Sequence, residues 1–336
     1  MKTKIRLGLN ELPFPPEAAV VKAARRACAG ANRYPEWDGA SLRTALAKRF
    51  RVTMDWVVVA GGSAAVIQQI MIASGQGEVA FGWPSFDAFP AIAEGLRMPV
   101  RRVELLDHAC DLDKLAKALT PQTSVVILCT PNTPTGGVIA HEVMASFLQR
   151  LPSHIIAIID EAYGEFVRDK TAVRALEFVQ RYPNVVMTRS FSKAFGMAGF
   201  RVGYAIAQPE LAARIISAGV PFSVPLPAQE AALAALQNEE EAVARIEEII
   251  QERHRLTTAL RAFNTEVVEG NGNFIWLPLG ELAAKVATLL ADHGIMVKAL
   301  MPHGVRITVG TPKETDYLLK AWSKVVSLIK EERQVA

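Results

Sequence analysis

One lysine of this sequence stands in surroundings that suit covalent chemistry. Lys193 lies in the segment 188–204 among small and hydroxyl-bearing residues, with Ser190 and Ser192 close before it and Arg201 eight residues after it. A lysine that attacks a carbonyl group needs a partly desolvated amine beside an anion-binding pocket, and two hydroxyls with a guanidinium are suitable phosphate donors. The alternative is a strand that leaves the core at 185–188 and enters a glycine-rich loop without a catalytic role.

A carboxylate and a second arginine are also candidates for chemistry. Asp160 ends the apolar segment 154–159, where an unpaired carboxylate would be costly. It is expected either to pair with a cation or to cap the turn that follows. Arg306 opens the apolar segment 307–309, where an arginine needs an anionic partner. From the residues alone, a salt bridge to a nearby acid is the simpler explanation for Arg306.

Glycines mark a possible anion site near residue 62. A short apolar strand leads into Gly61-Gly62-Ser63 and then into a predicted helix over 64–74. The first turn of a helix offers unpaired N–H groups and the positive end of its dipole. The spacing matches neither a dinucleotide fingerprint nor a P-loop, and glycines that serve turn geometry alone are the alternative.

The elements around these residues predict an α/β fold with a doubly wound, mostly parallel sheet and a smaller α+β domain. Asn132, Asp160 and the Lys193 loop each follow a predicted strand, and ligands of such sheets bind at the carboxyl ends of the strands. We expect a large domain at 35–220, and a small domain with an N-terminal arm formed by 1–34 and 221–336. Short apolar segments predict strands at 54–60, 78–81, 100–105, 124–129, 154–159, 185–188, 203–207, 273–277, 295–298 and 305–309. Helical periodicity predicts helices at 17–29, 40–50, 64–74, 113–119, 141–150 and 228–262, and from about 281 and 314.

Composition narrows the class of protein. Half of the 336 residues are hydrophobic and the net charge is +3, which is typical of a globular protein and gives no indication of nucleic-acid binding. The three cysteines, Cys28, Cys110 and Cys129, fall at no metal-ligand spacing. The start lacks the apolar core of a secretory signal, and no apolar run approaches a membrane span. We therefore expect a soluble, cytoplasmic protein without a metal site.

The lysine segment also carries a family resemblance. The sequence Ser190-Phe-Ser-Lys-Ala-Phe-Gly-Met-Ala-Gly-Phe-Arg-Val-Gly203 resembles the cofactor-lysine signature of fold type I pyridoxal-phosphate aminotransferases, in particular the histidinol-phosphate aminotransferase-like group. Asp160-Glu-Ala-Tyr163 and Pro131-Asn-Thr-Pro-Thr-Gly136 are similar to two further motifs of this family. The resemblance extends from Asn10 to Thr311.

The resemblance implies a role for each matching residue. It implies that Lys193 bonds the aldehyde of pyridoxal 5′-phosphate, that Asp160 pairs with the ring nitrogen, and that Tyr163 and Asn132 bond the phenolic oxygen. The phosphate would be held by Ser63, Ala64, Ser190, Ser192 and Arg201, and Phe86 would stack on the ring. Arg306 and Asn10 would bind the substrate. Tyr34 would reach the phosphate of a neighbouring subunit, which implies a homodimer with shared active sites.

The activity implied is transfer of an amino group between an amino acid or amino-alcohol phosphate and a 2-oxo acid, most like histidinol-phosphate aminotransferase. The alternatives are an aromatic amino acid aminotransferase and a decarboxylase of a phosphorylated amino acid. A cofactor-sensing domain of a transcription regulator would need a DNA-binding module, which residues 1–30 do not supply. Ala64-Ala65 stands where relatives usually carry acids, a departure that removes a side-chain contact at the helix N-terminus but not backbone phosphate binding. Two further departures bear on histidinol phosphate as the substrate: Lys298 stands where relatives often carry arginine, and the loop between Lys298 and Arg306 is short.

Overall fold

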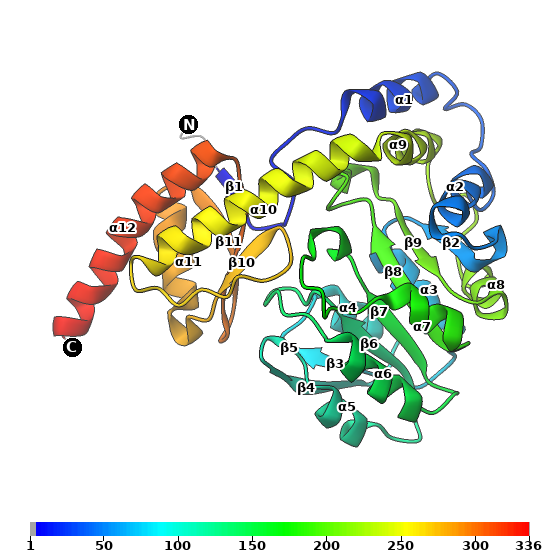
Figure 1. The fold of residues 1–336 in the computed structure, drawn as a ribbon, viewed down its shortest axis with the longest axis horizontal. Helices are drawn as coiled ribbons and strands as arrows, with labels where there is room; N and C mark the ends of the chain where they lie inside the picture. The colour runs from blue at the N-terminus through cyan, green and yellow to red at the C-terminus, as the bar shows by residue number, and fades with distance from the viewer. Residues whose placement is uncertain (1–4, 336) are drawn as a thin grey trace.

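Two β-sheets of unequal size organise the molecule (Figure 1). The computed structural model describes the backbone of residues 5–335 and the side chains of residues 5–329. The larger sheet has the strand order β2-β9-β8-β7-β6-β3-β4-β5, and the smaller one β1-β11-β12-β10. In the larger sheet the run from β8 to β4 is parallel, whereas β2, β9 and β5 pair antiparallel with their neighbours. This is the predicted mostly parallel α/β sheet with a smaller second unit.

The strands are short and the helices alternate with them in the first two thirds of the chain. The strands are β1 Ile5–Leu7, β2 Val57–Ala60, β3 Glu78–Trp83, β4 Val100–Leu106, β5 Ala109–Cys110, β6 Thr123–Cys129, β7 Ile156–Asp160, β8 Val185–Ser190, β9 Gly203–Ile206, β10 Phe274–Leu277, β11 Ile295–Leu300 and β12 Gly304–Thr308. The helices are α1 Ala18–Cys28, α2 Ala40–Phe50, α3 Ser63–Ala73, α4 Ala88–Gly95, α5 Leu112–Ala118, α6 His141–Arg150, α7 Ala175–Arg181, α8 Pro209–Ser217, α9 Leu226–Gln237, α10 Glu239–Arg261, α11 Ala283–Asp292 and α12 Pro312–Val335.

The central strands explain the unbroken apolar runs of the sequence. Every residue of β6 and β7 is buried, because helices cover both faces of a parallel sheet and leave no solvent-facing side for polar residues. In β7 the run ends at Asp160, which lies level with Cys129 of β6 and Thr188 of β8. The polar residues that follow these strands therefore meet at one edge of the sheet.

Helix α10 joins the two sheets. Its first half contributes Ala242, Ile246 and Ile249 to the hydrophobic core around the large sheet, and its second half contributes Leu256 and Leu260 to the core of the small sheet. Helices α1 and α9, which the sequence groups with the small domain, also contribute to the core of the large sheet. In Figure 1, α10 runs between the two parts of the molecule, with α1 and α9 near its end at the large sheet. The domain boundaries at 34/35 and 220/221 stay predictions.

The single helix predicted over 228–262 is wrong, because the chain breaks it at Asn238. This residue leaves helical geometry, with φ −117° and ψ 34°, and its side-chain amide donates to the carbonyl oxygen of Ala234 in the last turn of α9. The acidic run Glu239-Glu-Glu241 then occupies the first turn of α10. Carboxylates are favourable there, since they face the positive end of the helix dipole.

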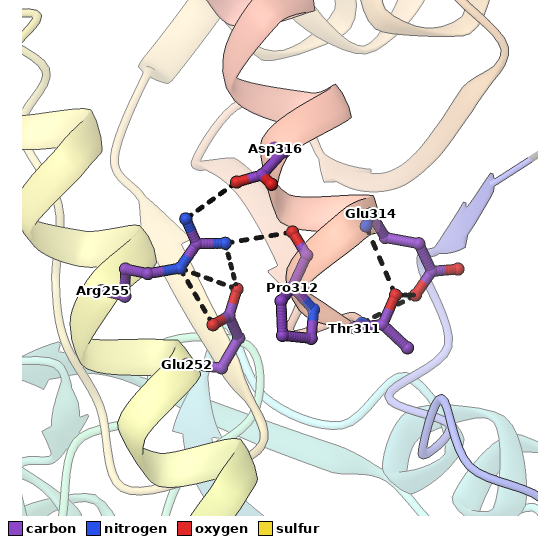
Figure 2. A network of polar contacts seen from close by, with 6 residues as sticks. All are labelled: Glu252, Arg255, Thr311, Pro312, Glu314 and Asp316. Carbon is purple, nitrogen blue, oxygen red and sulfur yellow. Dashed lines mark hydrogen bonds and ion pairs between the residues drawn. The ribbon is translucent and has the colours of Figure 1, made fainter.

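The start of α12 is fixed by a cap and by an arginine from α10, and Figure 2 shows both. Thr311 and Glu314 exchange hydrogen bonds in the pattern of a capping box, with Pro312 in the first helical turn. Arg255 binds Glu252 of its own helix, Asp316 of α12 at 2.8 Å and the carbonyl oxygen of Pro312 at 3.0 Å. These contacts hold the segment after β12, and so help to fix the strand that carries Arg306.

None of the helices in the part of the chain that the structure describes combines the length and the apolar character that crossing a bilayer would require.

Candidate active site

A cavity of about 240 Å³ lies where the carboxyl ends of the large-sheet strands face the small sheet. Ten of the thirteen site residues predicted from the sequence line it, and they come from both sheets. These ten are Ser63, Ala64, Phe86, Asp160, Tyr163, Ser190, Ser192, Lys193, Arg201 and Arg306. The fold therefore brings together the lysine, the carboxylate and the arginine that the sequence singled out.

Lys193 follows strand β8, and its amine is held by the N-terminal arm. The Nζ atom donates to the carbonyl oxygens of Leu9 and Asn10, each at 3.0 Å. Burial is the main cause that lowers the pKa of Lys193 to about 8, and the neighbouring positive charge of Arg306 contributes to the same shift. A larger fraction of the amine is therefore neutral near physiological pH than for an exposed lysine, which is the state that attacks a carbonyl or accepts a proton.

Asp160 is a buried carboxylate with no cationic partner among the side chains of residues 5–329. One of its oxygens accepts the hydroxyl of Thr188 at 2.9 Å, and the carboxylate also accepts the N–H of Ala162 in the following turn. Burial raises the pKa of Asp160 to about 6, although both hydrogen bonds act in the opposite direction. The predicted turn contact is therefore present, and the carboxylate would still gain from a cation in the cavity.

Ser190, Ser192 and Arg201 lie with the first turn of α3 at one corner of the cavity, and their donors make this corner suited to an anion. Arg201 donates to the hydroxyl of Ser192 at 3.2 Å, and the backbone N–H of Ser192 donates to the hydroxyl of Ser190. Gly62 precedes α3 with a φ of 97°, and a Cβ atom there would lie 2.5 Å from the Arg201 guanidinium. Only glycine allows this approach, so the arginine can lie beside the N-terminus of an eleven-residue helix.

Tyr163 and Asn10 form a hydrogen-bonded pair beside the cavity. The side-chain amide of Asn10 donates to the Tyr163 hydroxyl oxygen at 2.8 Å, and burial raises the pKa of Tyr163. Asn10 also accepts from the hydroxyl of Thr308 and does not line the cavity itself. Asn10 therefore contacts Tyr163, which lines the cavity, without lining the cavity itself. The predicted contact of Asn10 with the substrate stays a prediction.

Asn132 is buried and does not line the cavity. Its side-chain amide donates to the carbonyl oxygen of Pro84 at 3.0 Å and to the hydroxyl of Thr135 at 2.7 Å, and its amide oxygen accepts from Ser85. Both amide hydrogens are thus engaged with the surrounding loops. A bond from Asn132 to a cofactor oxygen would require one of these contacts to be exchanged, and this role stays a prediction.

Arg306 projects from β12 with no carboxylate within ion-pair distance among the described side chains. Its guanidinium donates to the hydroxyl of Thr133 at 2.8 Å and to the carbonyl oxygen of Gly8 at 2.6 Å, while Nε has no partner. Burial lowers the pKa of Arg306. The salt bridge that the residues alone favoured is absent from this part of the chain, and the cavity contains a positive charge available to an anion.

Of the two aromatic residues predicted to contact the cofactor, Phe86 lines the cavity and Tyr34 does not. Phe86 lines the cavity and packs edge-on against Phe89, with ring centroids 5.5 Å apart. Tyr34 lies outside the cavity: 84% of it is exposed, and its ring stacks on Phe222. An exposed, stacked tyrosine is available to a second subunit, but it contributes nothing to the cavity of its own chain.

Sequence reasoning missed several lining residues. Ser85 and Thr133 neighbour Phe86 and Asn132 in the motifs already singled out, so their position in those loops was the available signal. Asp87 lies in the same loop, and Lys298 was noted only as a departure from the family. Leu9 and Leu300 line the cavity without any local signal, because ordinary apolar residues are expected throughout a core.

The fold and this cavity define a class of protein, the fold type I pyridoxal-phosphate-dependent enzymes, and comparison with known proteins agrees. The family described as aminotransferase class I and II matches residues 2–321. Aromatic amino acid aminotransferases of Corynebacterium efficiens and Corynebacterium glutamicum are 40% and 41% identical, over 96% and 95% of this chain and 93% of each relative. Histidinol-phosphate aminotransferase of Sinorhizobium meliloti, solved with pyridoxal-5′-phosphate, superposes with a TM-score of 0.92 at 25% identity, covering 98% of this chain and 92% of its own.

The chain belongs to the aminotransferase class I and II family. It is a pyridoxal-phosphate-dependent aminotransferase, and the residues present fit the cofactor. The buried Asp160 carboxylate has no cationic partner among the side chains of residues 5–329, the corner at α3 is suited to an anion, and burial lowers the pKa of Lys193.

Because Asp160 is buried without a cationic partner among the described side chains, its ionisation should lower the free energy of unfolding of the cofactor-free protein. Between pH 3.8 and about 6 the folded, cofactor-free protein holds a proton that the unfolded chain releases, so stability is lost as the pH rises through about 6. We expect cofactor-free Asp160→Asn to exceed the parent by up to about 3 kcal/mol in unfolding free energy at pH 7.5, and this gain to disappear below pH 4. Urea unfolding at both pH values measures it. A parent as stable as the variant at pH 7.5 would contradict the prediction.

Proposed function

We propose that this aminotransferase takes aromatic amino acids as amino donors and a 2-oxo acid as acceptor. The observation that carries this proposal is the charge distribution opposite the anion corner. Among the described side chains Arg306 has no carboxylate partner, and the neighbouring cation Lys298 is paired with Asp87 at 2.9 Å. Leu9 and Leu300 line the same cavity. A substrate with one carboxylate and an apolar side chain matches these groups better than one with a distal phosphate.

Four residues of the cavity have proposed parts in the chemistry of this reaction. When bound, pyridoxal phosphate supplies an electron sink for the bonds at the substrate α-carbon. Lys193 holds the cofactor's aldehyde end and moves a proton at that carbon as general acid and base. Asp160 keeps the ring nitrogen protonated, and Tyr163 donates to the phenolic oxygen. Arg306 binds the substrate carboxylate through its guanidinium.

The remaining contacts with the cofactor are proposed in the same way. The phosphate would be held at the first turn of α3 by Ser63 and Ala64, and the hydroxyls of Ser190 and Ser192 and the guanidinium of Arg201 would donate to it. Backbone N–H groups supply the contact at α3, so the alanine at position 64 does not prevent binding.

Two other substrates have some support. Histidinol phosphate is favoured by the likeness to the Sinorhizobium meliloti enzyme and by the presence of Lys298 in the cavity. It is the substrate that the sequence motifs favour, but here Lys298 is already paired. For a decarboxylase of a phosphorylated amino acid, the support is a likeness of fold to the L-threonine-O-3-phosphate decarboxylase of Porphyromonas gingivalis at 22% identity.

A panel of amino donors tests the proposal. The holoenzyme is mixed with phenylalanine, tyrosine, tryptophan, histidinol phosphate or O-phosphothreonine, and the cofactor spectrum is followed together with the product. We expect the aromatic amino acids to exceed histidinol phosphate in kcat/KM by at least about tenfold, because a distal phosphate finds no free charged donor. Preference for histidinol phosphate, or release of carbon dioxide from O-phosphothreonine, would overturn it.

We also propose that the active enzyme is a homodimer in which Tyr34 completes the phosphate site of the neighbouring subunit. The support is an aromatic cluster in which the exposed rings of Tyr34 and Trp37 both contact Phe222, because exposed aromatic side chains are available to a second subunit. Inactive Lys193→Ala protomers mixed with Tyr34→Phe protomers should regain activity, because some sites then contain both native residues. A fully active monomer in sedimentation would exclude the shared site.

A further inference from the structure

An ion pair spans the mouth of the cavity. The Nζ atom of Lys298 on β11 lies 2.9 Å from a carboxylate oxygen of Asp87, which precedes α4 on the large-sheet side. Both residues line the cavity, and their side chains are 40% and 52% exposed. The Asp87 side chain makes no capping hydrogen bond to α4, so its carboxylate is not required by the helix.

The register of the small sheet places this pair next to the substrate arginine. Lys298 of β11 is directly opposite Arg306 of β12, so the two side chains project from the same face of the sheet. Leu300 lies two residues further along β11 and also lines the cavity. If Arg306 binds the substrate carboxylate, the pair and Leu300 border the space left for the substrate side chain.

The charges of the lining residues then fall into separate groups. Arg201 belongs to the anion corner, and Lys193 and Asp160 face the cofactor. At the remaining end of the cavity, the charged lining residues of the described chain are Arg306, Lys298 and Asp87. Asp87 neutralises Lys298 there, which leaves one uncompensated positive charge for one carboxylate.

We propose that Asp87 determines the specificity of this enzyme by holding Lys298. This inference rests on the proposed function, in which Arg306 anchors the substrate carboxylate. A side chain that ends in an anion would have to break the ion pair and would then lie beside the Asp87 carboxylate. An apolar or aromatic side chain leaves the pair intact. Asp87 is therefore a repulsive element against acidic and phosphorylated substrates, and such elements are a common source of specificity.

The partial exposure of the pair fits this role. Solvent screens exposed ion pairs, so the contact between Asp87 and Lys298 contributes little to folding. Removing the aspartate should consequently leave the protein folded while adding one net positive charge to the substrate side-chain end of the cavity. An anionic side chain would then find a lysine amine without a competing carboxylate.

The experiment compares substrates that differ only in charge. Single-turnover reactions of the holoenzyme are followed by the cofactor spectrum with glutamate and glutamine, in the parent, Asp87→Asn, Lys298→Met and the double variant. We expect Asp87→Asn to raise the glutamate-to-glutamine ratio of kcat/KM by about tenfold. Lys298→Met should remove this gain in the double variant, because the lysine is the group that Asp87 restrains.

Inhibitor binding gives a second measurement that needs no turnover. Glutarate and pentanoate are matched in length and differ by one carboxylate. Asp87→Asn should strengthen the binding of glutarate relative to that of pentanoate by about the same factor as in the glutamate and glutamine assay. Unchanged ratios in both assays would overturn the proposal, as would a gain that persists when Lys298 is methionine. Phenylalanine in the same assay tests the proposed substrate separately. If the parent does not react with phenylalanine but Asp87→Asn still changes the two ratios, the proposed substrate is wrong and the role of Asp87 stands.

Discussion

Replacing Lys193 with alanine is expected to lower the rate of transamination by about 10⁴-fold or more, because the variant loses both the amine that bonds the cofactor and the group that moves the proton. Steady-state assays with phenylalanine and a 2-oxo acid measure the loss. The absorbance of the protein-bound cofactor should change in the same variant, since no covalent bond to the chain can form.

A matched control and a mapping experiment sharpen this prediction. Lys170 is an exposed lysine outside the cavity, and Lys170→Ala should retain the activity and spectrum of the parent. Borohydride reduction of the parent followed by peptide mapping should place the cofactor on Lys193. Label on any other lysine, or a Lys193→Ala variant with substantial activity, would show that the assignment is wrong.

Arg306→Lys is expected to lower kcat/KM by roughly 30- to 1000-fold, which corresponds to about 2 to 4 kcal/mol of transition-state binding. Lysine keeps the positive charge but lacks the planar fork that grips a carboxylate while also donating to Thr133 and Gly8. The cofactor spectrum should stay that of the parent, because Arg306 is proposed to bind the substrate and not the cofactor.

Arg255 supplies a comparison for the same substitution. It lies in the network between α10 and α12 and not in the cavity, so Arg255→Lys should affect stability more than kcat/KM (Figure 2). If Arg306→Lys weakens cofactor binding or lowers the melting temperature while kcat/KM is retained, Arg306 belongs to the scaffold.

Much of the cavity was predictable because its residues follow strands. In a parallel sheet, the residues after β7 and β8 must meet at one edge, so Asp160 and Lys193 could be placed near each other from sequence order alone. The same reasoning found the glycine turn before α3. In each case a local sequence pattern, an apolar run or a pair of glycines, predicts where the strand before the residue ends.

Other features depend on contacts that no local pattern encodes. The side chains of Asn10 and Asn132 are oriented by Tyr163 and Ser85, which lie far away along the chain. The pairing of Asp87 with Lys298 requires the two sheets to face each other. The break at Asn238 was hidden because the apolar residues on its two sides, Ala235 and Ala242, keep the seven-residue spacing of one continuous helix, and only the geometry of Asn238 separates α9 from α10.

The N-terminal arm has a consequence for how the enzyme is made. The arm meets the cavity through Asn10, whose N–H and side chain bond Thr308, and through Gly8, whose carbonyl accepts from Arg306. A ribosome adding about 5 to 20 residues per second needs roughly 15 to 60 s to pass from the first of these partners to the last. In the later part of that interval Lys193 is already synthesised, but the strand bearing Arg306 is not. The residues of one chain that are proposed to hold the cofactor, which lie between Ser63 and Arg201, are therefore made before the strand that carries the substrate arginine. The proposed substrate site is completed last, when the C-terminal strands pair with the arm.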